Sequence, residues 1–171
     1  METVGLTGVL KWDVGNLASS MHLSQEDVVQ YFTDGRRISF LLERRICNEV
    51  LGGTLPESEG ASFDLTDKEG HKWEVRSVTS KGTYFCPSFM IGSGRSFDED
   101  GFLTKLQEVK GYILADITTF PNVEYWSVDS YKVIEMYLNG DTSKESKISR
   151  DKVMKLTRPA SGWIQEDLVA V

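Results

Sequence analysis

The sequence predicts an α/β protein with a central mixed β-sheet flanked by helices. Residues 62–66 and 72–76 alternate between apolar and polar side chains on either side of a short loop, the pattern of a β-hairpin. Residues 111–117 form a short, mostly apolar run that is typical of a central strand. Segments with helical periodicity and capping residues precede and follow these strands. With 171 residues, the chain is long enough for one domain with a core of its own.

Two helices are expected before the hairpin. Ser24 is a good N-cap because three polar or acidic residues follow it, and the helix should run to about Phe32. A second helix is expected over residues 37–51, ending at the pair of glycines that begins with Gly52. Its apolar stripe consists of Ile38, Leu42, Ile46 and Val50.

The remaining elements follow from shorter patterns. Residues 1–20 are expected to form short strands or loop. After the hairpin we expect a buried strand or extended segment at 83–90, a helix at 102–109, a second late strand at 124–128, a helix at 130–138 and a loop at 139–149.

The sequence pattern predicts the register of the hairpin as well as its presence. Its three-residue loop ends in Gly70, which supplies the positive φ that such a loop needs. This loop length pairs Leu65 with Trp73 and Phe63 with Val75, so that all four apolar side chains share one face. A two-residue loop would mix the two faces, so the register is well defined.

The polar face of the hairpin carries two opposed carboxylates, Asp64 and Glu74. Like charges that face each other across strands, with Cβ atoms about 5 Å apart, destabilise a sheet. A divalent cation would offset the repulsion, because Mg²⁺ takes oxygen ligands and is held by one or two carboxylates. Arg76, on the same face, could hold a phosphate. The alternative is an edge hairpin whose carboxylates splay into solvent and pair with Lys72 and Arg76.

Glu43 is unusual because it lies at the margin of the buried face of the second predicted helix. A carboxylate in such a place usually has a partner. One interpretation is a salt bridge to Arg36, Arg44 or Arg95. The other is a third acidic group close to the metal.

The charge of the chain bears on whether it can bind nucleic acid. The net charge of −7 counts against a nucleic-acid binder. Net charge is not the local field, however, and basic residues cluster along the chain. The two groups are Arg36, Arg37, Arg44 and Arg45, and then Lys72, Arg76, Lys81 and Arg95.

Cys47 and Cys86 have no metal-type spacing and are expected to be buried thiols, which favours a cytoplasmic protein. No apolar run approaches the length of a membrane span, so no membrane partner is expected. The N-terminal residues lack the pattern of a signal peptide.

The order of helix, acidic hairpin, central strand, strand and helix resembles the core of the PD-(D/E)XK nuclease superfamily. Within it, the hairpin is most similar to the small homodimeric type II restriction endonucleases of the Pvu type. The residues that match their metal-site pattern are Asp64, Asp67, Gly70, Glu74, Arg76 and Ser77. The motif covers one hairpin, and the looser core order covers residues 37–138. The resemblance implies a restriction-endonuclease-like core in a single nuclease-like domain, residues 1–171.

The resemblance also implies an activity, a Mg²⁺-dependent endodeoxyribonuclease that hydrolyses phosphodiester bonds of duplex DNA, with Mn²⁺ as a possible substitute. Asp64 and Glu74 would hold the metal, and Arg76 and Glu43 would be the other catalytic residues. A homodimer is expected, because a symmetric duplex has two strands to cut.

One departure from the family's pattern matters. The family's lysine is Arg76 here, and arginine stays protonated and cannot act as a base. Lys72 or Lys81 could take over the role of that lysine, and both, with Arg95 in its glycine-rich loop, are candidate DNA contacts. The alternative function is a non-catalytic DNA-binding or interaction protein on a nuclease-like core.

Overall fold

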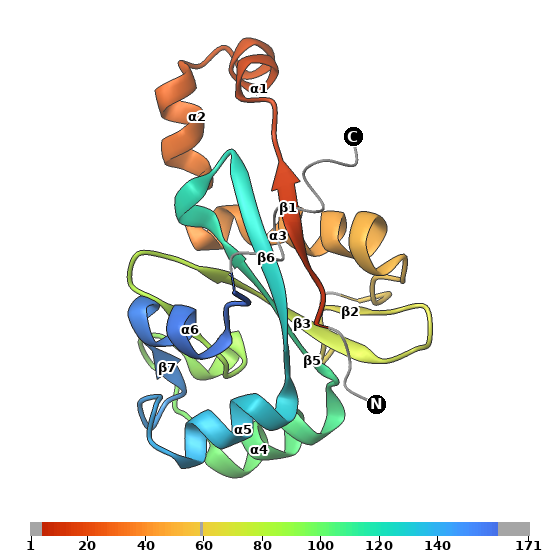
Figure 1. The fold of residues 1–171 in the computed structure, drawn as a ribbon, viewed down its shortest axis with the longest axis vertical. Coiled ribbons are helices and arrows are strands. Elements are labelled where there is room, and N and C mark those ends of the chain that lie inside the picture. Colours follow the sequence, from red (N-terminus) through yellow and green to blue (C-terminus); the bar gives the residue numbers. More distant parts are fainter. Residues whose placement is uncertain (1–4, 59, 161–171) are drawn as a thin grey trace.

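The structure, a computed structural model, describes residues 5–58 and 60–160. Its centre is a mixed sheet in the order β1-β6-β5-β3-β2 (Figure 1). The β3–β5 pair is parallel and the other pairs are antiparallel. The strands are β1 (Thr7–Lys11), β2 (Leu65–Thr66), β3 (Lys72–Val78), β5 (Gly111–Asp116) and β6 (Asn122–Asp129). The predicted α/β class and the central position of the 111–117 strand are thus confirmed.

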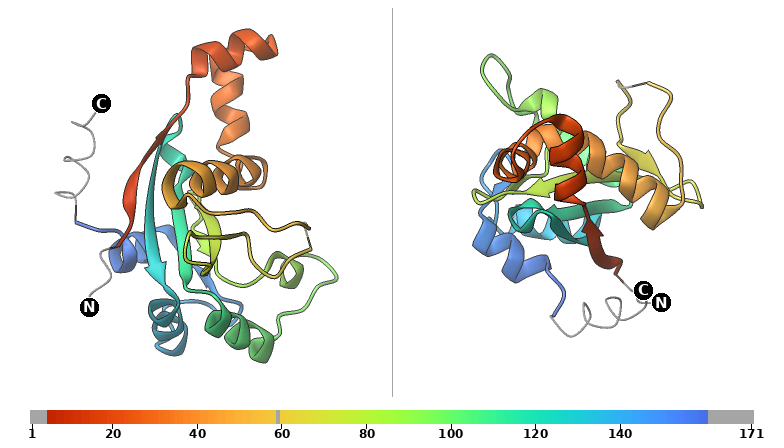
Figure 2. Two further views of the ribbon diagram at one scale, coloured as in Figure 1. Left: turned by 90° about the vertical axis from the view of Figure 1, so that its right-hand side faces the viewer. Right: turned by 90° about the horizontal axis from the view of Figure 1, so that it is seen from above.

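Helices cover the sheet on both faces, and a small second sheet pairs β4 (Thr83–Tyr84) with β7 (Lys147–Ile148). Figure 2 shows α1 and α2 rising from one end of the main sheet. The helices are α1 (Val14–Met21), α2 (Gln25–Phe32), α3 (Gly35–Arg45), α4 (Glu99–Glu108), α5 (Ser130–Leu138) and α6 (Arg150–Thr157), with a π-helical turn η1 (Ile46–Leu51) and the 3₁₀ turns η2 (Ser88–Met90) and η3 (Ile117–Thr119).

The two faces of the sheet support two separate cores. Side chains alternate along a strand, so Trp73 and Val75 of β3 pack into the cluster covered by α2, α3 and η1. Tyr112 and Leu114 of β5 point the other way, into the cluster covered by α4, α5 and α6. Glu74 and Arg76 therefore lie on the side of β3 that faces this second cluster.

The two helices expected before the hairpin are confirmed. The Ser24 side chain accepts a hydrogen bond from the Asp27 N–H and caps α2, which ends at Phe32. The second helix comprises α3 and η1, and Gly52 ends it in the left-handed conformation with φ 56°. Its last turn is π-helical rather than α-helical.

The two ends of the chain were predicted less well. Residues 1–20, expected to be strand or loop, contain β1 and also α1, which Asp13 caps. Arg150–Thr157 form α6, which was not expected, although Ser149 caps it. The segment 83–90, expected to be one strand, pairs only at β4 and then turns into η2.

Both cysteines are buried and free, as predicted. None of the helices in the described part of the chain has the length and apolar character that crossing a membrane requires.

Candidate active site

The hairpin that carries the acidic residues has the predicted register. Leu65 pairs with Trp73 and Thr66 with Lys72. Gly70 ends the loop with φ 85°, and a Cβ there would meet no other atom, so its backbone conformation is what requires glycine. The strand β2 is only two residues long, and this shortness shapes the site.

The predicted pairing of Phe63 with Val75 is wrong. Phe63 packs against the cluster on the opposite face of the sheet from Val75, and the Lys72 ammonium lies 5.1 Å from the centre of its ring. The chain bends over residues 62–64, so the alternation of the strand ends at Leu65. For the residues that precede Leu65, the sequence pattern does not predict the face of the sheet on which a side chain lies.

Asp64 lies at the open edge of β3, where β2 has stopped. Its N–H donates to the Trp73 carbonyl at 3.1 Å. Its Oδ2 accepts the Val75 N–H at 2.8 Å, a bond that a longer β2 would make with its backbone. The carboxylate therefore takes the place of the missing strand, and this explains how a charged group is held at the sheet.

Arg76 joins the two carboxylates. Its Nη1 lies 3.3 Å from Asp64 Oδ2 and donates to the Val75 carbonyl at 3.0 Å. Its Nη2 lies 2.8 Å from Glu74 Oε2. Asp64 and Glu74 are thus brought together, but through a shared guanidinium group.

Glu74 has a second cation that the sequence did not reveal. Lys105 of α4 places its Nζ 2.8 Å from Glu74 Oε1, within ion-pair distance although without the geometry of a hydrogen bond. The available signal was the position of Lys105 on the stripe formed by the buried residues Phe102, Leu106 and Val109. A lysine at such a position needs an acidic partner.

The alternative interpretation, in which both carboxylates splay into solvent, is wrong for Glu74. Glu74 is only 1 % exposed. Its ion pairs with Arg76 and Lys105 neutralise a charge that would otherwise be costly to bury. Of the two cations that the alternative interpretation named, Arg76 is a partner, and Lys72 lies instead against Phe63.

Glu43 reaches the same site from α3. Within the described residues it forms no ion pair, so the expected salt bridge to Arg36, Arg44 or Arg95 is not found. Burial raises its pKa to about 7 from an ordinary 4.5, and the negative charge of Asp64 adds to the shift. Arg44 and Arg76 oppose the shift without cancelling it.

The charges at the edge of β3 influence one another. Burial, followed by the charge of Glu74, raises the pKa of Asp64, although Arg76 and the Val75 N–H act in the opposite direction. Burial works to lower the pKa of Arg76, but Glu74 and Asp64 outweigh it and the net shift is upward. The arginine therefore stays charged.

The donor set is chemically suited to a hard cation. Asp64, Glu74 and Glu43 offer carboxylate oxygens, the ligand type that Mg²⁺ prefers. The hydrogen bonds to Asp64 found among the described residues all go to Oδ2, so Oδ1 faces no competing donor there. The three carboxylates do not gather their ligand atoms within 4.8 Å, and Mg²⁺ usually keeps several waters that bridge such gaps.

A second acidic group lies in the hairpin loop. Ligand atoms of Asp67, Glu69 and His71 all fall within 4.8 Å of one another. Asp67 already accepts the N–H groups of Glu69 and His71, each at 2.9 Å, and the indole N–H of Trp73 at 2.9 Å. Because these donors occupy both of its oxygens, the loop group is explained by the turn that it stabilises.

The residues expected to contact DNA are spread out. Lys72 and Lys81 lie at opposite ends of the β3 segment, and neither is bonded to Asp64 or Glu74. Arg95 donates to the Ser88 carbonyl at 2.9 Å and so braces its own loop. The structure therefore places Lys105, rather than either predicted lysine, beside the acidic pair.

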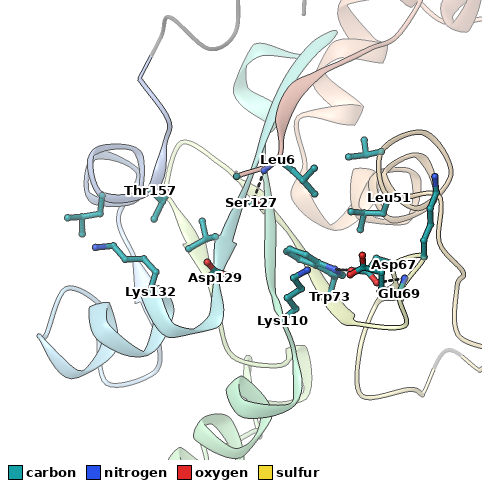
Figure 3. A pocket seen from close by; sticks show the side chains of 15 residues that line it. Leu6, Leu51, Asp67, Glu69, Trp73, Lys110, Ser127, Asp129, Lys132 and Thr157 are labelled. Carbon is teal, nitrogen blue, oxygen red and sulfur yellow. Dashed lines mark hydrogen bonds between the residues drawn. The ribbon is translucent and has the colours of Figure 1, made fainter. Parts of the chain in front are cut away.

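A cavity of about 590 Å³ opens elsewhere, between the hairpin loop, the start of β5, the end of β6 and α6 (Figure 3). Its wall includes Trp73 and Lys110, whose ammonium lies 5.7 Å from the centre of the indole ring. Asp67, Glu69 and Lys132 also line it, so its charges are mixed. Neither Asp64 nor Glu74 is among the lining residues, and the cavity is separate from the acidic site.

Comparisons with protein-family models, with curated proteins and with solved structures found no match to this chain.

Proposed function

We propose that this protein is a metal-dependent endodeoxyribonuclease that hydrolyses phosphodiester bonds of duplex DNA, in its narrower form a restriction-type enzyme built on a restriction-endonuclease-like core. The observation that carries the proposal is the convergence of Asp64, Glu74 and Arg76 at the open edge of β3. Two carboxylates joined by a guanidinium group supply ligands for a cation and a donor for a phosphate at the same place.

Each residue has a role that its surroundings support. Asp64 and Glu74 would hold the metal, Mg²⁺ or in its place Mn²⁺. Bound there, the metal would supply an acidified water and a counter-charge for the phosphate oxygens. Arg76 stays charged and can donate two N–H groups to a phosphate when one of its carboxylate partners turns to the cation.

Glu43 and Lys105 complete the site. The pKa of Glu43, about 7, lets its carboxylate accept and release a proton near neutral pH. Lys105 lies beside Glu74 and is in a better position than Lys72 or Lys81 to replace the family's lysine. A homodimer would present two such sites to the two strands of a duplex.

The test is incubation of supercoiled plasmid with Mg²⁺ or Mn²⁺, with and without chelator. Wild-type protein should nick or linearise the plasmid only with metal. Asp64→Asn should abolish cleavage while keeping the carbonyl oxygen that accepts the Val75 N–H. Glu135→Gln, which changes an exposed carboxylate on α5, is the matched control and should cut normally. Absence of cleavage with every divalent metal and many DNA sequences would refute the proposal.

A second candidate is a non-catalytic DNA-binding or interaction protein on the same core. The observation in its favour is that Arg76 and Lys105 already match both oxygens of Glu74. A carboxylate neutralised by the protein itself has less need of a metal. DNA binding that is unaffected by divalent metal, without cleavage, would favour this candidate.

A further inference from the structure

Helix α3 carries a row of basic and aromatic side chains on its outer face. Arg36, Phe40 and Arg44 are spaced by four residues, so they lie one above the other on consecutive turns over roughly 12 Å of helix. Arg37 lies beside this row, and its guanidinium is 4.7 Å from the ring centre of Tyr31 on α2. We call these five residues the α3 ridge.

Among the described residues, no carboxylate oxygen lies within 4.0 Å of a guanidinium nitrogen of the ridge arginines. Arg44 donates only to the Phe40 carbonyl, at 3.3 Å. By contrast, several arginines outside the ridge do form ion pairs. They are Arg45 with Glu49, Arg76 with Asp64 and Glu74, Arg150 with Asp116, and Arg158 with Glu124. In a chain with a net charge of −7, an unneutralised basic row on one helix is complementary to a polyanion.

The aromatic members of the ridge are unusually open. Phe40 is 52 % exposed and Tyr31 is 40 % exposed. The Arg44 guanidinium lies against the Phe40 ring, with its central carbon 3.3 Å from the ring centre. Flat, exposed groups that alternate with cations are what a strand with unpaired bases requires, because bases stack on rings and guanidinium planes while phosphates meet the charges.

We propose that the α3 ridge binds single-stranded nucleic acid. A duplex would meet the arginines through its phosphates but would hide its base faces from Phe40 and Tyr31. An acidic peptide or an anionic membrane would use the charges and leave the interleaved rings without a stacking partner. The unpaired strand is the one polyanion that uses both kinds of side chain.

The ridge leads to the acidic site. On a helix that turns 100° per residue, Glu43 lies about 20° from Arg36, at the border of the ridge. The negative charges of Asp64 and Glu74 in turn contribute to the raised pKa of Glu43. The binding of a single strand by the ridge does not rest on the proposed function, which concerns duplex DNA.

The experiment measures binding of a fluorescein-labelled oligothymidylate by anisotropy in chelator, so that cleavage plays no part. The triple variant Arg36→Gln/Arg37→Gln/Arg44→Gln should bind at least tenfold more weakly. It should also reduce the slope of log Kd against log salt by about two, because three phosphate contacts to a single strand are lost. The control Lys144→Gln/Lys152→Gln/Lys155→Gln removes three exposed charges elsewhere and should bind as the wild type does.

The aromatic contribution is tested separately. Phe40→Ala should weaken binding about tenfold with little change in salt dependence, since it removes a stacking surface and no charge. Tyr131→Ala, which removes an 85 % exposed ring from α5, is the control and should have no effect. A duplex of the same length should bind more weakly than the single strand and should not respond to Phe40→Ala.

The proposal would be overturned by no binding of the oligonucleotide, by binding that the triple variant retains, or by duplex binding equal to that of the single strand. Ridge-dependent binding to phosphatidylserine vesicles, without oligonucleotide binding, would assign the ridge to a membrane and overturn it as well. Ridge-dependent strand binding without any metal-dependent cleavage would refute the proposed nuclease and leave the ridge proposal standing.

Discussion

The hairpin carries two acidic groups that differ in what neutralises their charges. The edge group is Asp64 and Glu74, and the loop group is Asp67 and Glu69 with His71. At the edge of β3, Asp64 and Glu74 are met largely by cations, Arg76 and Lys105. In the loop, Asp67 is met by N–H groups of the turn itself and of Trp73. The two groups stand within ten residues of each other, and the sequence alone does not separate them.

The pKa shifts of Asp64 and Asp67 run in opposite directions. Burial raises the pKa of Asp64, and the neighbouring charge of Glu74 adds to the shift. Burial also acts on Asp67, but the N–H donors from Trp73, His71 and Glu69 outweigh it and lower its pKa. A carboxylate that is hard to ionise among other carboxylates is a candidate for chemistry, whereas one held ionised by its own turn is structural.

The largest effect should come from Glu74→Ala, because it leaves Arg76 and Lys105 without their buried partner. Removing one member of such a group costs about 3–5 kcal/mol of unfolding free energy, and metal-dependent cleavage should also be lost. Urea denaturation measures the first effect and plasmid cleavage the second. Glu69→Ala, in the exposed loop, is the control and should stay within about 0.5 kcal/mol of wild type. Equal stability of Glu74→Ala and wild type would show that the edge group is not the neutralised cluster described above.

Arg76→Lys should have the next largest effect. Arg76 reaches the Val75 carbonyl and Asp64 through Nη1 and Glu74 through Nη2, and one ammonium group cannot reach all three. We expect a loss of about 2 kcal/mol in urea denaturation, with Arg158→Lys at a half-exposed pair as the milder control.

The same variant separates two roles for Arg76 in cleavage. Retained or increased activity per folded molecule would mean that the arginine contributes only a positive charge, which a lysine supplies equally well. Lower activity would mean that its two-pronged contact with phosphate matters.

Asp67→Ala should destabilise the hairpin by about 1–2 kcal/mol, because three N–H groups lose their acceptor in a partly exposed turn. Cleavage by the folded fraction should be unchanged, since Asp67 belongs to the loop group. Asp67→Asn keeps the acceptor for the two backbone N–H groups and should lose only part of this stability. A cleavage defect in Asp67→Ala that exceeds its folding defect would instead make the loop group part of the site.

A further effect is a pH dependence carried by Glu43. Because its pKa is raised in the folded state from 4.5 to about 7, the folded protein holds this proton more tightly than the unfolded chain. The contribution of Glu43 to stability is therefore present below pH 4.5 and is lost as the pH rises through 7. In metal-free urea titrations, Glu43→Gln should match wild type at pH 4.5 and exceed it at pH 8. Equal stability of the two proteins at both pH values would contradict the raised pKa.

The hairpin shows how far sequence patterns reach. Alternation together with a glycine-ended loop fixed the Leu65–Trp73 pairing, because a slip by one residue would have exposed two large apolar side chains. The same alternation failed one step later at Phe63, where the strand had ended. Strand length depends on tertiary contacts, and no local signal marked the bend.

The partners of the acidic residues were the least predictable part of the site. Lys105 lies 31 positions beyond Glu74, on a helix packed against the face of the sheet that carries Glu74, and only the fold brings the two together. Glu43 was singled out correctly as unusual, because its place at the margin of an apolar stripe is a local property. The proposed role of each residue in cleavage stays a prediction.

The placement of Asp64 and Arg76 also affects how the protein behaves at high concentration. A strand with free N–H and C=O groups along its edge can pair with the same edge of another molecule and begin aggregation. Where β2 ends, the Val75 N–H is taken by Asp64 and the Val75 carbonyl by Arg76, so this stretch of β3 offers no template to a second chain. The side chains proposed for catalysis therefore also protect the sheet, and a variant that loses Asp64 would gain a strand edge prone to association.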